Sequence, residues 1–211
     1  MNKSRTFPQE PKIMETKNLN KSRTFPQDII PNGGKVRDKK VLMIIAFQNF
    51  KDEEYFVPKE ILAKAGVSVL TASTKKGTAL GAAGGEAEVV LSLSEVKAGD
   101  FDGAVFIGGP GAAVLIDNTE CHRIAQEAVA AGKILGAICI APAILAKAGV
   151  LQGKQATVWS SALDKSAVEI LRNNGAIYQD EKVVVDGKII TANGPAAAHE
   201  FGKTLVGLLG P

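Results

Sequence analysis

The stretch 133–145 joins a strand to a helix with almost no loop between them. An apolar run of strand length ends at Cys139, and a helical pattern that begins at Pro142 follows at once. A residue in so tight a turn is pushed toward a strained backbone conformation, and small neighbours let the two backbones approach each other. Ala137 and Ala141 are those small neighbours. The stretch therefore predicts a nucleophile elbow with Cys139 at its tip.

Strand and helix patterns alternate from residue 40 onward. Apolar strand runs are predicted at 41–47, 67–72, 101–107 and in the run that ends at Cys139. Helices are predicted at 52–65, 119–131, 166–173 and 196–209, a small hairpin within 77–91, and short strands at 156–159, 176–178, 183–185 and 189–191. Continuous apolar strands are typical of a parallel sheet covered on both faces. The Asp186-Gly187 turn predicts one antiparallel pair at an edge. The pattern therefore predicts an α/β three-layer sandwich with a mostly parallel, flavodoxin-like sheet.

The first 40 residues carry the excess of positive charge. They hold ten basic and four acidic residues, a net charge of +6, whereas the other residues hold 15 basic and 18 acidic ones, a net charge of −3. The octamer at 2–9 also recurs, unchanged, at 20–27. We expect a basic, poorly ordered arm at 1–39, with a docking peptide as the alternative interpretation, and a domain at 40–211. Because the positive charge belongs to the arm, no nucleic-acid partner is expected for the domain.

Membrane and secretion signals are not evident in the sequence. No apolar run approaches the roughly 20 residues of a membrane span, and the polar N-terminus lacks the apolar core of a signal peptide. Two cysteines, Cys121 and Cys139, are few for a secreted disulfide framework. We therefore expect a cytoplasmic protein with no membrane partner.

Three segments with complementary chemistry follow strands at the same predicted edge of the sheet. They are the acidic helix start with Glu53 and Glu54, the glycine turn 108–111 and Cys139. A carboxyl group beside a thiol can share its proton, and glycine-turn amides can stabilise an oxyanion. Two local alternatives stay open, because cysteine is often a buried packing residue and acidic residues favour any helix start. The turn lacks the G-x-G-x-x-G spacing of a dinucleotide site, and we predict no cofactor and no metal.

Several motifs occur in a characteristic order along residues 40–210. They are Glu54 with Pro58 four residues later, Gly108-Gly109 after a strand, Ala137-Ile138-Cys139-x-x-Pro142, the strand pair 183–191, and Gly194-Pro195. In this combination the chain resembles the PfpI/ThiJ family of the class I glutamine-amidotransferase-like superfamily, which includes the parkinsonism-associated deglycase and archaeal intracellular peptidases. The resemblance implies that Cys139 is the nucleophile and Glu54 the carboxylic acid bonded to it. It also implies an anion-binding pocket at Gly109 and the Ile140 amide, and a homo-oligomer of two or more subunits.

Departures from the family pattern separate the activities within it. Peptidase-like members carry a histidine where this chain has Ile140, and deglycase-like members carry one where this chain has the stretch 159–161. Arginines of the deglycase branch are replaced by Ala87 and Asn193. The chain has two histidines, His122 and His199, and the second follows Gly194-Pro195 closely. The residues predicted to line the pocket are Gly108, Trp159, Gly194, Pro195 and His199.

A cysteine and a carboxyl group without an imidazole suit small carbonyl compounds better than peptides. We therefore predict a cysteine-dependent enzyme of glyoxalase or protein-deglycase type, which acts on a small aldehyde or a glycated protein, with Glu54 as proton shuttle. The alternatives are a redox-sensing, stress-related or chaperone-like protein that oxidises Cys139, and a PfpI-type peptidase, which Ile140 disfavours. An amidotransferase is weaker still, because no synthetase domain or His-x-Glu pair is present. The helix after Cys139 also predicts a stabilised thiolate.

Overall fold

The computed structural model describes residues 38–210, and its core is a seven-stranded sheet. The strand order is β11-β12-β8-β7-β1-β3-β6, and every neighbouring pair is parallel except β11 with β12. The strands are β1 (Lys40–Ile44), β3 (Ser68–Ser73), β6 (Leu91–Ser92), β7 (Gly103–Phe106), β8 (Ile134–Ile138), β11 (Val183–Asp186) and β12 (Ile189–Ala192). The predicted, mostly parallel sheet with one antiparallel edge pair is confirmed. The repeated octamer and nearly all of the predicted arm lie outside the described residues.

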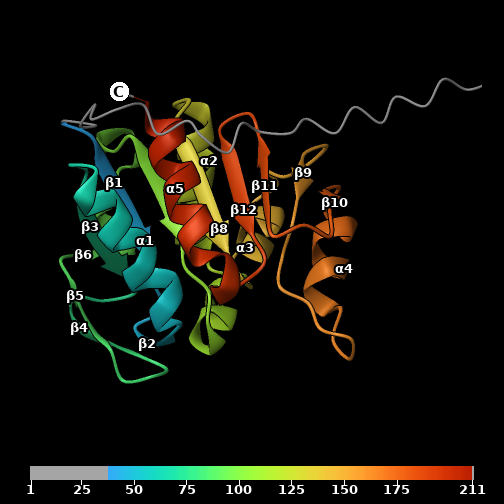
Figure 1. The fold of residues 1–211 in the computed structure, drawn as a ribbon, viewed down its shortest axis with the longest axis horizontal. Coiled ribbons are helices and arrows are strands. Elements are labelled where there is room, and N and C mark those ends of the chain that lie inside the picture. The colour runs from blue at the N-terminus through green and yellow to red at the C-terminus, as the bar shows by residue number, and fades with distance from the viewer. Residues whose placement is uncertain (1–37, 211) are drawn as a thin grey trace, which may run out of the picture.

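Helices cover both faces of this sheet and complete three layers (Figure 1). The helices are α1 (Asp52–Lys64), α2 (Thr119–Ala130), α3 (Pro142–Lys147), α4 (Ser166–Asn173) and α5 (Ala198–Leu209). Along β1, Leu42 and Ile44 face the core formed with α2, α3 and α4, while Val41 and Met43 face the core formed with α1 and α5. All four are almost fully buried, as expected where both faces of a parallel strand are covered. The three-layer prediction is therefore confirmed.

Two smaller sheets flank the main one. β4 (Gly77–Gly81) and β5 (Glu86–Val89) form the predicted antiparallel hairpin, which adds the unpredicted strand β2 (Gln48–Phe50) at one edge. β9 (Gln155–Ala156) and β10 (Ile177–Tyr178) pair with each other in a separate sheet. Short 3-10 turns complete the fold at Leu93–Glu95, Ala98–Asp100, Pro110–Leu115 and Pro195–Ala197.

The order of the strands determines where on the sheet the site lies. From β1 the chain passes through α1 to β3 on one side, while β7 pairs with β1 on the other side and β8 pairs with β7. The carboxyl ends of β1, β7 and β8 therefore lie next to one another where the strand order reverses, which is the usual position of a ligand site in such sheets. In the part of the chain that the structure describes, no helix is long and apolar enough to cross a membrane.

Candidate active site

Cys139 sits in the tight turn between β8 and α3. Its φ is +64°, in the left-handed region that residues other than glycine rarely adopt. The Cys139 N–H donates to the Ala192 carbonyl at 2.9 Å, and the Cys139 carbonyl accepts from the Trp159 N–H at 2.8 Å. Ala137 and Ala141, two residues away on either side, are fully buried. The predicted elbow is present, and hydrogen bonds on both sides hold its strained tip in place.

Glu54 lies in the first turn of α1, with its side chain turned into the protein. The residue is 0% exposed, and neither carboxyl oxygen has a hydrogen-bond partner of good geometry among residues 38–210. Its polar neighbours are the Cys139 thiol and the Gly108 amide. Burial raises the pKa of Glu54 to about 7, and these two neighbours only partly offset it. An unpartnered buried carboxylate is costly, so the neutral acid is favoured up to neutral pH.

Gly108 lets the acid and the cysteine come together. A Cβ atom at this position would lie 2.6 Å from the Cys139 Cβ, 2.7 Å from Glu54 Oε2 and 2.7 Å from the Ile138 carbonyl oxygen. Real Cβ atoms do not approach other atoms so closely. Glycine at the end of β7 is therefore required by the contact between the two reactive side chains and not by a turn alone.

The pKa of the Cys139 thiol differs from the sequence expectation. Burial, and then the charge of the Glu54 carboxylate, raise the pKa of Cys139 to about 12. The amides of Gly109 and Ile140 act in the opposite direction, but their effect is smaller. The prediction of a thiolate stabilised by the following helix is therefore wrong. The two groups form one unit, in which the proton can be on the carboxylate or on the sulfur.

The predicted pocket residues divide into two groups. Gly108, Gly109 and Ile140 adjoin the sulfur, and Trp159 touches the elbow through its backbone N–H while its indole lies against Gly194. Pro195 and His199 are exposed, and no contact described in residues 38–210 joins them to Cys139 or Glu54. His122 bonds to the Ile116 carbonyl at 2.7 Å, next to α2.

Asp52 has a contact that the sequence did not predict. Its carboxylate accepts the N–H groups of Ala83 and Gly85 in the turn between β4 and β5, at 2.8 and 2.7 Å. Burial acts against it, but these two amides lower the pKa of Asp52. The sequence pattern at 52–54 predicts only a helix start and the acidic residue of the site. Gly81 and Gly85, which lie against this carboxylate, are the feature of the sequence that could have indicated the contact.

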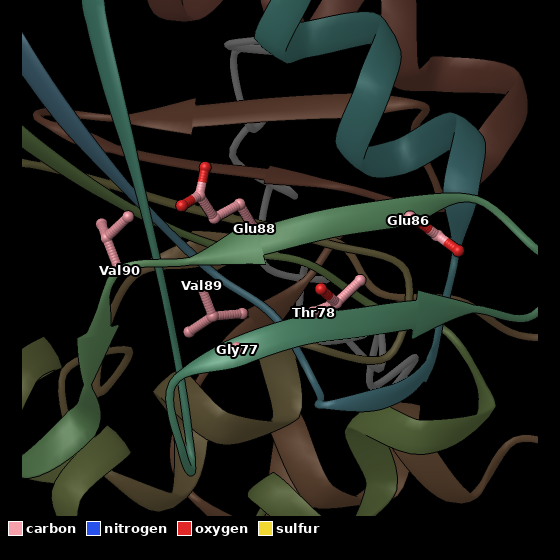
Figure 2. Close-up of a pocket in the computed structure, with 6 residues that line it drawn as sticks. All are labelled: Gly77, Thr78, Glu86, Glu88, Val89 and Val90. Carbon is pink, nitrogen blue, oxygen red and sulfur yellow. The ribbon is translucent and has the colours of Figure 1, made fainter.

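A hollow described in residues 38–210 lies away from this site. It measures about 600 Å³ and opens on the β4–β5 hairpin (Figure 2). Its lining consists of Gly77, Thr78, Glu86, Glu88, Val89 and Val90. None of these is a predicted site residue, so the hollow gives no support to the Cys139 chemistry. Within the described residues, no group of three or more His, Cys, Asp or Glu side chains is placed to hold a metal ion.

Known proteins resemble this chain in sequence and in fold. The model of the DJ-1/PfpI family matches residues 39–208. A deglycase of Pyrococcus abyssi is 32% identical over 168 residues, which cover 80% of this chain and 98% of the relative. A glutathione-independent glyoxalase of Caenorhabditis elegans is 28% identical over 168 residues, which cover 80% and 87%. The crystal structure of a ThiJ/PfpI domain protein from Brachyspira murdochii matches with a TM-score of 0.78 and 36% identity, over 82% of this chain and 97% of that chain.

Proposed function

This chain belongs to the DJ-1/PfpI family, and we propose that it is an enzyme of the hydrolase or lyase kind that acts on small reactive carbonyl compounds. The observation that carries the proposal is the position of the Glu54 carboxyl group beside the Cys139 thiol, buried and without a hydrogen bond of good geometry among residues 38–210. The relatives named as a deglycase and a glyoxalase support the same class of substrate. In this proposal Cys139 is the nucleophile and Glu54 moves the proton.

The reaction begins when the Cys139 sulfur adds to the aldehyde carbon of a 2-oxoaldehyde. The thiol proton passes to the Glu54 carboxylate, a sulfur–carbon bond forms, and the carbonyl electron pair moves onto oxygen. The amides of Gly109 and Ile140, which face the sulfur, would donate hydrogen bonds to that oxyanion. Protonated Glu54 then neutralises the oxyanion and completes a hemithioacetal.

The second half of the reaction moves a hydrogen between carbons. The Glu54 carboxylate removes the proton from the former aldehyde carbon and returns a proton to the neighbouring carbon, which converts the hemithioacetal into a thioester of a 2-hydroxy acid. Water cleaves that thioester, releases the acid and restores the thiol. Methylglyoxal and water thus become lactic acid with no external oxidant, and adducts of the same aldehyde on protein side chains are a related substrate.

A peptidase is a weaker proposal. Cysteine peptidases pair the nucleophile with an imidazole that accepts its proton. The chain has Ile140 directly after the nucleophile, and neither His122 nor His199 contacts Cys139 in the described residues. The Cys139–Glu54 unit is therefore better suited to carbonyl addition than to amide cleavage.

A redox sensor is the second candidate, and the different exposure of the two cysteines favours it. Cys139 is half-buried, whereas Cys121 is fully buried. Protonated Glu54 and the Gly109 and Ile140 amides could donate hydrogen bonds to a sulfinate on Cys139. Peroxide treatment followed by intact and peptide mass measurement separates the candidates. Selective addition of two oxygens at Cys139, in a protein that turns over no carbonyl compound, would favour the sensor.

Turnover of the full-length protein tests the proposed enzyme. We expect methylglyoxal to be converted to lactate, glyoxal to glycolate, and a glycated peptide to be restored, each measured by the product formed. Protein alkylated at Cys139 beforehand is the control and should form none of these products. Turnover by the alkylated protein at the untreated rate, or no turnover of any of the three substrates, would contradict the proposal. A cytoplasmic location and a homo-oligomeric state, a dimer or larger, remain predictions.

The rate should depend on pH through Glu54. Because Glu54 must be ionised to accept the thiol proton, kcat/KM should increase about tenfold per pH unit below pH 7 and level off above it. The position of the inflection follows from burial, which raises the pKa of Glu54 to about 7. Initial rates with methylglyoxal between pH 5 and pH 9 measure it. A constant kcat/KM across this range would show that Glu54 is not the base.

A further inference from the structure

The turn between β4 and β5 is fastened to the start of α1 by one carboxylate. Asp52, the first residue of α1, accepts the N–H groups of Ala83 and Gly85. The Ala82 N–H donates to the Phe50 carbonyl at 2.8 Å, two residues before Asp52. The hairpin turn (residues 82–85) is thus bonded to the segment that leads directly into Glu54.

Two glycines lie directly against that carboxylate. A Cβ atom at Gly85 would lie 2.5 Å from Asp52 Oδ1, and one at Gly81 would also collide with the Asp52 carboxyl group. Gly81 is buried and its N–H donates to the Gly85 carbonyl at 2.7 Å, so the turn is closed around the side chain. Neither glycine has a positive φ, so backbone conformation does not explain them. The three atoms nearest to a Cβ at Gly81 all belong to the Asp52 carboxyl group, whereas a Cβ at Gly85 would also lie 2.5 Å from the Phe56 ring.

The other side of the same segment is held by the glycine turn of the active site. The Lys51 N–H donates to the Gly108 carbonyl at 3.0 Å. A Cβ atom at Gly109 would lie 2.8 Å from the Asn49 carbonyl oxygen, and one at Gly111 would collide with the Gln48 carbonyl. The segment 48–52 therefore lies between two turns that contact it through glycine, and Glu54 follows it by two residues.

We propose that Asp52 is a positioning residue, which fixes the first turn of α1 through the hairpin turn and so holds the Glu54 carboxyl group against Cys139. The assignment rests on the proposed function for the role of Glu54 in turnover. The positioning itself does not depend on turnover, because the Asp52 contact sets where the Glu54 carboxyl group lies, and that group has no hydrogen bond of its own among residues 38–210. In this view the hairpin is a structural support of the active site.

A general helix-start effect makes a different prediction. Asp52 and Glu53 are both acidic residues of the first turn of α1, so both interact favourably with the helix dipole. Glu53 is exposed and pairs with Lys51 at 3.2 Å, without contacting the hairpin turn. The charged groups that act on Glu54 are Lys51 and Glu53, and the titratable group facing it from the elbow is Cys139. Glu53→Gln is therefore a matched control for Asp52→Asn.

The experiment measures Cys139 alkylation by iodoacetamide from pH 5 to pH 10, with kcat/KM for methylglyoxal as a second readout. In the wild type and in Glu53→Gln, we expect an inflection near pH 7 from the coupled pair. In Asp52→Asn, we expect that inflection to disappear and kcat/KM to fall by about 10- to 100-fold. An inflection retained in Asp52→Asn, with a rate within twofold of Glu53→Gln, would overturn the proposal.

A second variant breaks the contact from the hairpin side and keeps the charge of Asp52. Gly81→Ala, whose Cβ would meet the Asp52 carboxyl group first, should displace the carboxylate and reproduce the result of Asp52→Asn, whereas Gly99→Ala, where a Cβ meets nothing within 4 Å, should behave as wild type. If Asp52→Asn fails to fold, Gly81→Ala decides the question. If no variant and no wild type turns over methylglyoxal, the proposed function fails, while alkylation still tests the role of Asp52.

Discussion

Glu54→Gln and Cys139→Ala are each expected to lower kcat/KM for methylglyoxal by about 10³-fold or more. Removal of an acid–base group costs 10²- to 10⁴-fold in typical enzymes, and removal of the nucleophile leaves no atom to form the hemithioacetal. Glutamine has the shape of glutamate but cannot take up the thiol proton. Because the two groups act as a unit, the double variant should be no worse than the poorer single one. Steady-state rates of lactate formation measure all three.

Cys121→Ala is the matched control for this prediction. Cys121 is fully buried in α2, and burial raises its pKa to about 12, so it has no part in the proposed reaction. Its replacement should leave kcat/KM within about twofold of wild type. Wild-type turnover by Cys139→Ala would contradict the proposed nucleophile, and wild-type turnover by Glu54→Gln would contradict the proton shuttle.

The stability of Glu54→Gln relative to wild type should also increase as the pH rises. The pKa of Glu54 is about 7 in the folded protein against 4.5 for an unperturbed group. Between these values the folded state binds more protons than the unfolded state, so wild-type stability falls as the pH rises through this window. The shift corresponds to about 3 kcal/mol above pH 7. The free energy of unfolding of Glu54→Gln relative to wild type should therefore increase by about that amount between pH 4.5 and pH 8.

Urea unfolding at the two pH values measures this difference. For each protein, the free energy of unfolding at one pH is subtracted from that at the other. This removes the cost of the buried amide that Glu54→Gln introduces, because that cost is the same at both pH values. Glu53→Gln removes an exposed carboxylate that is paired with Lys51, and it should not show the increase. A difference between Glu54→Gln and wild type that does not change with pH would mean that Glu54 is not held as a neutral acid.

Local sequence patterns predict most of the secondary structure. The helix predicted at 166–173 has the bounds of α4, because its apolar residues recur at helical spacing and one face packs against the core. The elbow at Cys139 was also predictable, since a strand pattern and a helix pattern leave no room for a loop. β2 was not predicted, because it has three residues and forms only by pairing with β4 from a distant segment.

The electrostatics of the site could not be read from the sequence in the same way. The sequence pattern predicts Cys139 as the nucleophile and the family resemblance points to Glu54, but the predicted direction of the thiol pKa is wrong. Desolvation and the neighbouring carboxylate outweigh the two amides, and burial depends on the whole fold rather than on local residues. The Asp52 contact was missed for a related reason, since the hairpin turn lies about 30 residues further along the chain.

The hydrogen bonds that hold the elbow differ in range from those of the loop that follows Trp159. Cys139 is bonded into the sheet through Ala192, whereas the loop 159–165 is held mainly by its own short-range bonds, such as those of Ser161 with Leu163 and Asp164. Sequence change in such a loop costs little folding stability. The loop can therefore change in sequence while the backbone of Cys139 stays fixed by the sheet.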